Sequence, residues 1–149
     1  MEQELKDKLY EHALKLLAMR SHSEKELRRK LTLYLIRRKL TTGLTLLDGI
    51  VKRLQEQKYL SDEEFAEQFS ISRQSGKPRS KRMLSFELQK RGLAREVIEK
   101  TLDEYDEVEA CRKLAAKKQR YSKEELTAFL QRQGFPWEII NDTVHRIRQ

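Results

Sequence analysis

The sequence predicts an all-α fold, arranged as an elongated, curved array of three tandem three-helix repeats. The main observation is an internal repeat: residues 80–102 align without a gap to residues 122–144, with 9 of 23 positions identical. The second observation is composition, because charged and hydrophobic residues each make up 38% of the chain, with only two Pro and five Gly. This balance is typical of solvated helices, and a repeat of this kind is typical of helical repeat proteins.

The first repeat is expected to be irregular. A weaker copy of the repeat begins at Ser23, which aligns with Ser80, but its second half aligns Ile50 with Ile98, and the two halves match only if a gap is opened between them. We therefore expect a nine-residue insertion near residues 32–49. The predicted repeats are residues 1–60, 61–105 and 106–149.

Within the insertion, two changes are expected. Apolar residues 33–36 would lengthen the preceding helix, and Thr41–Gly43 would form a loop. The irregularity of the first repeat is thus predicted to lie between its second and third helices.

Each repeat is expected to open with a helix, because apolar residues recur at helical spacing in residues 4–19, 61–74 and 107–119. Helix starts are marked by a serine followed three residues later by a glutamate, the pattern of the capping box. These serines are Ser23, Ser61 and Ser122.

Glycines mark the expected ends of the second helices in the last two repeats. Gly92 and Gly134 are each followed by an apolar residue, as expected where a left-handed glycine ends a helix. Pro136 then suits the first turn of the final helix. The sequence therefore predicts nine helices, three in each repeat.

The distribution of charge favours an anionic partner. The formal net charge is +8, which indicates nucleic acid or a nucleoprotein before other classes of partner. Residues 1–60 carry 14 basic and 8 acidic side chains. The densest local cluster is in residues 73–95, where eight basic residues stand against one acid, Glu87. We interpret this stretch as a contact surface rather than as a solvated helix face.

The sequence offers no catalytic or cofactor-binding set. His12, His22 and His145 have no carboxylate or thiol at metal-ligand spacing, so we expect no metal site. No glycine-rich phosphate loop occurs. Cys111 is the only cysteine, and its apolar neighbours predict a buried thiol. We therefore expect a protein that is not an enzyme and that uses no cofactor.

Several segments resemble the RecX family of bacterial regulatory proteins. They are Ala13–Leu14 with Ser21–Leu31, Tyr59–Ala66, Glu87–Leu93, and Phe129–Leu130 with Arg132–Phe135. The likeness holds in residue type, order and spacing across all three repeats. Two features depart from the family pattern: the insertion in the first repeat, and Ser80–Lys81 where family members commonly have Gly-Pro. Serine is itself a good helix cap, so this helix start is expected to survive.

The resemblance implies a negative regulator of the recombinase RecA. Such a protein binds in the groove of the RecA filament on single-stranded DNA and blocks filament extension or promotes disassembly. RecA ATPase, strand exchange and SOS coprotease activity would be inhibited as a result. The resemblance also implies weak, non-specific binding to single-stranded DNA. The start of the chain reads as neither a signal peptide nor a membrane span, so we expect a cytoplasmic protein. We also expect it to be a monomer.

Basic residues of all three repeats are the candidate contacts to RecA or DNA. For Arg28 the alternative is a helical ion pair, because Glu24 precedes it by four residues. The candidates are Arg20, Arg28, Arg29, Arg37, Arg38, Arg73, Lys77, Arg79, Lys81, Arg82, Lys90, Arg91, Lys117, Lys118 and Arg120.

Two aromatic residues have more than one interpretation. If Leu84 and Leu88 face the core, helical geometry places Phe86 on the opposite face beside Arg82. Phe86 is then either an exposed interface anchor or a packing contact with a neighbouring repeat. Trp137 has the side chain to stack on a base, but we interpret it as part of the core of the last repeat.

The sequence is also compatible with a second function. Short three-helix units with capped second helices also resemble helix-turn-helix modules, which place a helix in the major groove of DNA. A direct DNA-binding regulator of this kind would bind duplex DNA tightly without RecA and with a steep salt dependence.

Overall fold

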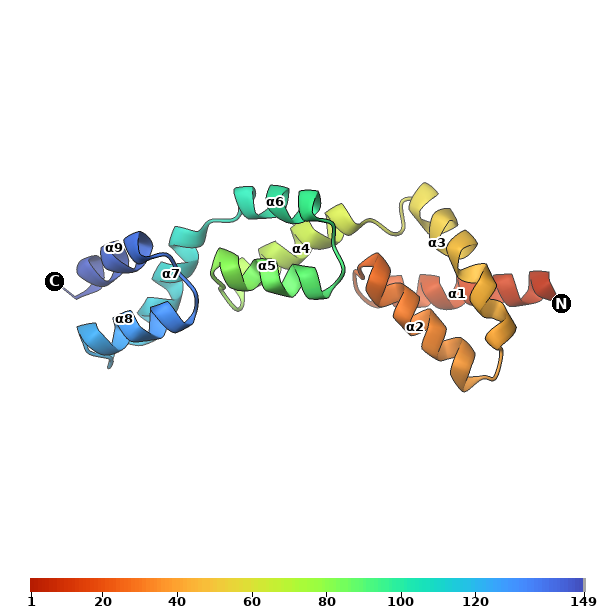
Figure 1. Cartoon of the computed structure of the whole chain (residues 1–149), viewed down its shortest axis with the longest axis horizontal. Helices are drawn as coiled ribbons and strands as arrows, with labels where there is room; N and C mark the ends of the chain where they lie inside the picture. Colours follow the sequence, from red (N-terminus) through yellow and green to blue (C-terminus); the bar gives the residue numbers. More distant parts are fainter. Residues whose placement is uncertain (149) are drawn as a thin grey trace. The chain divides into compact units, whose positions relative to one another are not determined.

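The computed structural model describes residues 1–148, and these residues form nine α-helices, one 3₁₀-helix and no strand (Figure 1). The elements are α1 (Glu2–Met19), α2 (Glu24–Arg37), η1 (Thr41–Leu46), α3 (Leu47–Glu56), α4 (Asp62–Ser75), α5 (Lys81–Lys90), α6 (Arg95–Glu104), α7 (Glu107–Ala116), α8 (Lys123–Arg132) and α9 (Trp137–Ile147). The prediction of an all-α fold built as a helical repeat array is confirmed.

The helices gather into two compact units. Unit 1 contains Met1–Ala66 together with Arg91–Leu93, and unit 2 contains Glu67–Lys90 together with residues 94–148. The boundaries of the three repeats at residues 60 and 105 stay a prediction.

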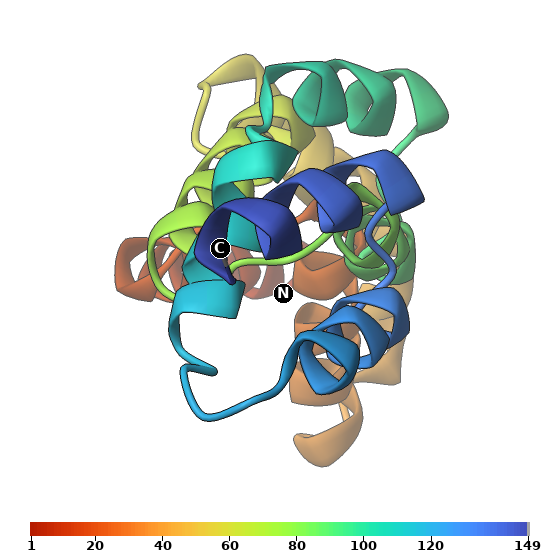
Figure 2. The same ribbon diagram turned by 90° about the vertical axis from the view of Figure 1, so that its left-hand side faces the viewer.

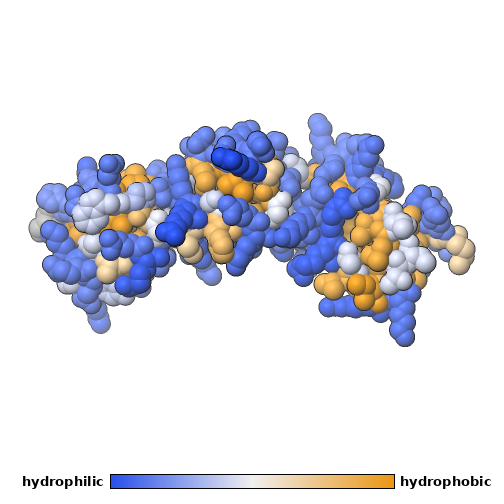
Figure 3. Space-filling view, viewed as in Figure 1, coloured by the Kyte–Doolittle hydropathy of each residue, from blue (hydrophilic) through white to orange (hydrophobic). Residues whose placement is uncertain are grey.

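Unit 1 is held by a leucine-rich core between α1, α2, η1 and α3. On α2 the residues Leu27, Leu31 and Leu35 recur every four positions and are fully buried, which is the spacing of one helix face. Leu9 and Ala13 of α1 meet them from the facing helix and are also fully buried. Figure 3 shows hydrophobic side chains among these helices, with hydrophilic ones around them.

The insertion changes the first repeat in two ways. Helix α2 has 14 residues whereas α5 and α8 have 10 each, so the predicted lengthening is confirmed. The predicted loop at Thr41–Gly43 is wrong, because these residues begin the 3₁₀-helix η1. Gly43 is buried, and a Cβ there would lie 2.8 Å from Leu35 Cδ2 and 3.0 Å from Leu5 Cδ2. Close packing of η1 against α1 and α2 makes this segment helical rather than open.

Unit 2 is built from α5 packed on α6, and from α7, α8 and α9 packed on one another. Figures 1 and 2 both show α9 joined to α8 by a short turn, with α7 against them. Leu84, Leu88, Leu126 and Leu130 are fully buried, as is Cys111, whose predicted burial is confirmed. This cysteine is a core residue, and its burial raises the pKa of the thiol.

The predicted helix starts are present. Ser23 and Ser122 each make the full capping box with the glutamate three residues later. The Ser61 hydroxyl accepts a hydrogen bond from the Glu64 N–H at 3.2 Å. Ser80, at the departure from the family pattern, accepts one from the Met83 N–H at 3.1 Å. The start of α5 is therefore capped without Gly-Pro.

The predicted glycine stops are present as well. Gly92 and Gly134 have φ values of 79° and 91°, the left-handed conformation that ends a helix. Among residues 1–148, no helix combines the length and the apolar character needed to span a bilayer.

Candidate binding surface on α5

Two of the three histidines make local structural contacts. His22 is buried, with Nδ1 2.8 Å from the Arg20 carbonyl and Nε2 2.8 Å from Lys30 Nζ. Burial lowers the pKa of His22, so the neutral ring is the favoured form. His12 stacks on Tyr34 with ring centroids 4.2 Å apart. Within residues 1–148, no three His, Cys, Asp or Glu side chains come close enough to hold a metal ion.

Several candidate bases of unit 1 are engaged in local contacts. Arg28 is 2.9 Å from Glu24 and 2.7 Å from Asp48, so the helical ion pair considered for it is present. Arg20 lies 3.1 Å from Glu26. These arginines hold α2 to its surroundings and have less charge to offer a partner.

The other candidate bases of unit 1 are exposed. The Arg38 guanidinium lies 4.6 Å from the Tyr34 ring centroid. Arg29 and Arg37 are exposed on α2, and no ion pair joins either of them to another residue in the described part of the chain. Both are therefore open to a phosphate group.

The dense basic cluster of residues 73–95 is partly neutralised by its one acid. Glu87 of α5 lies 2.8 Å from Arg73 and 3.4 Å from Arg79, and all three side chains are mostly buried. Arg79 is further held through its backbone, whose N–H donates to the Tyr105 hydroxyl at 2.9 Å. Arg73 and Arg79 therefore act as structural residues of unit 2.

Two other members of the cluster also have local roles. The backbone N–H of Lys81 donates to a Glu107 carboxylate oxygen at 2.8 Å, which caps the start of α5. Arg91 lies 3.9 Å from Glu26 within unit 1. The side chain of Lys77 is exposed.

One face of α5 remains open and basic. Arg82, Phe86 and Lys90 recur every four residues along it, while Leu84 and Leu88 on the other side are fully buried. This is the arrangement predicted from helical geometry. Phe86 is 53% exposed, so about half of its ring is open to solvent, while Arg132 and Gly134 from the end of α8 line a pocket beside it. Lys90 Nζ lies 4.6 Å from the Phe86 ring centroid.

This face borders a pocket of about 500 Å³ that also involves the end of α8. We call it the α5 pocket; its lining residues are Arg82, Met83, Ser85, Phe86, Gln89, Arg132 and Gly134. Arg132 was not among the sequence candidates, because it stands alone in its stretch of chain. The internal repeat could have identified it, since the alignment of the last two repeats places Arg132 at the position of Lys90.

The candidate bases of the last repeat differ in exposure, because two are exposed and one is packed. Lys117 and Arg120 are exposed. Lys118 packs on aromatic rings, with Nζ 5.0 Å from the Phe129 centroid, and its carbonyl accepts a hydrogen bond from Arg148 at 2.8 Å. Lys118 therefore closes the end of α7 and is a weaker candidate.

The interpretation of Trp137 as a core residue is wrong. Its side chain is 59% exposed. The core position near this helix start is filled by the neighbouring Phe135, which is buried. Trp137 is thus available to a partner at the start of α9.

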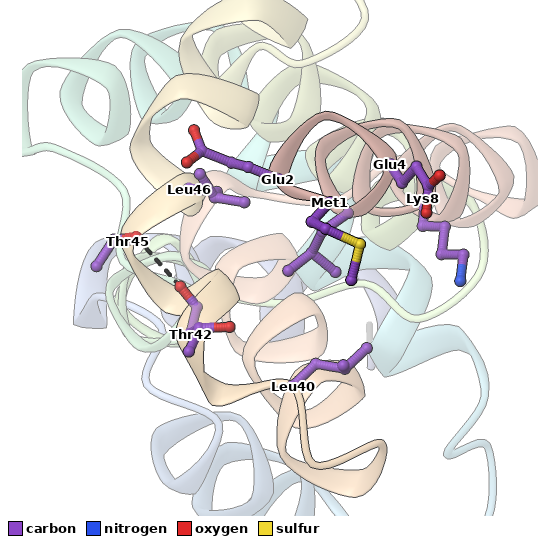
Figure 4. Close-up of a pocket in the computed structure, with 9 residues that line it drawn as sticks. Met1, Glu2, Glu4, Lys8, Leu40, Thr42, Thr45 and Leu46 are labelled. Atoms are coloured by element: carbon purple, nitrogen blue, oxygen red, sulfur yellow. Dashed lines mark hydrogen bonds between the residues drawn. The ribbon is translucent and has the colours of Figure 1, made fainter.

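A second pocket lies between the start of α1 and the insertion (Figure 4). It has a volume of about 350 Å³ and is lined by Leu40, Thr42 and Leu46 from the insertion. Its charged residues are Glu2 and Glu4 with Lys8, and carboxylates at the mouth disfavour an anion. The α5 pocket is therefore the better candidate for an anionic partner.

Comparisons with known proteins identify relatives of this chain. A family model described as RecX, second three-helix domain, matches residues 61–102. The regulatory protein RecX of Chlorobium limicola is 35% identical over 146 residues, covering 93% of this chain and 88% of the relative. That of Chlorobium phaeobacteroides is 33% identical, covering 94% and 93%. The crystal structure of RecX from Lactobacillus salivarius has the same fold, with a TM-score of 0.80, 21% identity and 98% coverage of each chain.

Proposed function

Because the chain belongs to the RecX family, we propose that it is a negative regulator of RecA that binds the RecA filament on single-stranded DNA. The observation that carries the proposal is the likeness to regulatory RecX proteins over nearly the whole chain. The surface supports it, because the open bases of α2 and α5 suit a partner bordered by phosphates. The proposal places the protein in the cytoplasm as a monomer.

The proposed activity is binding without chemistry. In the described residues, the polar groups of the α5 pocket are two guanidinium groups, an amide and a hydroxyl, and none is paired with a general base. ATP hydrolysis in the complex would be that of RecA. Repression would follow from occupation of the filament, either by blocking extension or by promoting disassembly.

The direct test is a titration of the protein into a RecA ATPase assay on single-stranded DNA. We expect the ATPase rate to fall, and to fall well before the two proteins are equimolar if extension at a filament end is blocked. Inhibition that appears only near equimolar amounts would indicate coverage of the groove. An unchanged rate at every ratio would disprove the proposal.

A pair of charge reversals tests the surface. We expect Arg82→Glu and Arg132→Glu to weaken inhibition, because both guanidinium groups face the α5 pocket. Lys100→Glu is the matched control, an exposed reversal of the same charge on α6. Arg79 and Arg91 are unsuitable targets, because a carboxylate there would stand beside Glu87 or Glu26 and perturb folding.

Duplex DNA binding by the same protein samples, measured without RecA, distinguishes this function from that of a direct DNA-binding regulator. A helix-turn-helix regulator would bind duplex DNA tightly without RecA, and the affinity would fall steeply with salt. We expect weak duplex binding without sequence preference. Tight, sequence-dependent duplex binding together with an unchanged RecA ATPase would favour the regulator that reads DNA directly.

A further inference from the structure

The α5 pocket is lined mainly by basic, aromatic and small polar residues. It lies wholly within unit 2, between the open face of α5 and the residues that end α8. Its volume of about 500 Å³ falls in the usual range of small-molecule sites. No carboxylate lines it, although acidic side chains are common elsewhere in the chain.

Phe86 is an aromatic ring that the fold itself does not require. The alignment of the repeats places Arg29 and Ala128 at the equivalent positions of α2 and α8. The helices therefore pack with an arginine or an alanine there. About half of this ring is exposed, with Lys90 Nζ 4.6 Å from its centroid, so the exposed part can contact an external group.

The charges around Phe86 are positive. Arg82 lies one turn before it on α5, and Arg132 enters the pocket from α8. Glu87, the next residue in the chain, is turned away from the pocket, because its carboxylate is held by Arg73 at 2.8 Å and Arg79 at 3.4 Å. Two guanidinium groups without a nearby carboxylate favour a phosphate, which they bind through paired N–H donors.

The remaining lining groups offer polar contacts beside the ring. Gln89 Nε2 and Ser85 Oγ are 3.5 Å apart, a weak hydrogen bond that leaves both able to contact a ligand. Gly134 contributes no side chain, so the mouth stays open at the end of α8. A flat group with a π-face and polar edges matches this set better than an aliphatic side chain does.

We propose that the α5 pocket binds one unstacked nucleotide of single-stranded DNA. The base stacks on Phe86, its polar edge meets Gln89 and Ser85, and an adjoining phosphate lies between Arg82 and Arg132. The inference rests on the proposed function, since it assigns this pocket to the DNA strand of the filament rather than to the protein. It also explains how a chain can bind a single strand without reading its sequence, because every base has a π-face.

The test is fluorescence anisotropy at low salt, without RecA, on two labelled oligonucleotides of equal length. One is a thymidine oligonucleotide and the other is its abasic analogue, which keeps the phosphates. We expect the wild-type protein to bind the thymidine strand about fivefold or more tightly than the abasic strand, the range of one base stacked on an aromatic ring. Equal affinity for the two strands would overturn the proposal.

Variants assign the preference to this pocket. We expect Phe86→Ala to abolish the preference for the thymidine strand and Phe86→Trp to retain it. Ile71→Ala, a truncation of a similarly exposed apolar residue on α4, is the matched control and should leave the preference unchanged. Circular dichroism checks that each variant keeps its helices. A Phe86→Ala protein with an unchanged preference would overturn the proposal.

The RecA ATPase assay on the same samples separates this proposal from the proposed function. If Phe86→Ala loses inhibition while its oligonucleotide binding is unchanged, the pocket holds a protein segment and the nucleotide assignment is wrong. If the wild type does not inhibit RecA but shows a preference that depends on Phe86, the proposed function fails and the nucleotide site stands.

Discussion

At the scale of single residues, two buried serines each connect the start of one helix to the end of another helical segment. We call this contact a serine–glycine joint. The Ser23 hydroxyl donates to the Arg91 carbonyl at 2.8 Å, and the Ser80 hydroxyl donates to the Gln133 carbonyl at 2.7 Å. The residue after each of these carbonyls is a left-handed glycine, Gly92 or Gly134. A side chain on either glycine would point at the helix that the serine caps. Each serine therefore caps its own helix and binds the end of another segment of the same unit.

This joint predicts different losses for two similar serines. We expect Ser80→Ala to lower the free energy of unfolding by about 1–3 kcal/mol, because it removes the cap of α5 and the donor to Gln133. Ser122→Ala should cost only about 1 kcal/mol, since this exposed serine caps only α8. Urea denaturation followed at a helical wavelength measures both. Equal losses would show that the joint contributes nothing beyond the cap.

His22 predicts a pH dependence of stability. Burial lowers its pKa below the ordinary value of 6.5, and the charges of Arg20 and Lys30 lower it further, while the Arg20 carbonyl and Glu26 oppose the shift. The unfolded chain therefore takes up a proton at a higher pH than the folded chain does. Stability is full above pH 6.5 and falls as the pH drops below it, until the folded histidine is protonated too.

Denaturation at several pH values on both sides of 6.5 checks this dependence. His22→Gln should flatten the slope, leaving the part due to His12, whose pKa burial also lowers. His145→Gln is the control, because this exposed residue lies near the end of α9. A slope that is unchanged in His22→Gln would contradict the assignment.

At the scale of elements, α2 and α8 end in the same way with different residues. The Lys39 N–H donates to the Ile36 carbonyl at 3.0 Å, and the Leu40 N–H to the Leu35 carbonyl at 2.8 Å. Gly134 and Phe135 make the equivalent bonds after α8, at 3.0 and 3.3 Å. Lys39 thus occupies the glycine position with φ of 57°.

Close approach explains where glycine is needed. At Gly134 a Cβ would lie 3.0 Å from the Ser80 hydroxyl, and at Gly92 it would lie 2.6 Å from Lys25 Cδ. Lys39 is exposed and carries its side chain into solvent. Lysine tolerates the left-handed conformation at some cost. A side chain at Gly92 or Gly134 would in addition have to displace Lys25 or press on the Ser80 hydroxyl.

The same substitution should therefore have opposite effects at two exposed lysines. Lys39→Gly is expected to raise the free energy of unfolding by about 1 kcal/mol, because it relieves the left-handed strain. Lys52→Gly, within α3, is expected to lower it by about 1 kcal/mol. Thermal unfolding of the two variants beside the wild type measures the difference. A loss of stability in Lys39→Gly would show that the lysine side chain itself stabilises this helix end.

At the scale of the whole molecule, the two units have separate cores. Leu27 belongs to the core of unit 1, and Leu126 lies buried among the helices of unit 2. In repeat arrays each part depends mainly on its neighbours, so local destabilisation stays local. Truncating either leucine to alanine should cost about 2–5 kcal/mol within its own unit.

Amide hydrogen exchange followed by mass spectrometry tests this independence. We expect Leu27→Ala to speed exchange mainly in α1, α2 and α3, and Leu126→Ala mainly in α7, α8 and α9. Each variant serves as the control for the other. A loss of protection that is spread evenly over the described chain in both variants would show one cooperative unit instead.

The sequence by itself determined the helices and the family. Capping serines, stop glycines and apolar spacing act within a few residues, so Ser23, Ser122, Gly92 and Gly134 could be interpreted without knowing what lies beside them. The expected loop at residues 41–43 failed because its conformation depends on packing against α1 and α2.

Only the tertiary structure decided which charges and rings are available to a partner. Residues 73–95 contain eight basic residues and one acid, Glu87. In the folded chain Glu87 pairs with Arg73 and Arg79, which turns its carboxylate away from Phe86. Folding also brings Arg132 to Arg82 across a gap of many residues. Side-chain pairing and exposure depend on distances between segments that are remote in the chain, and local sequence patterns carry no information about those distances.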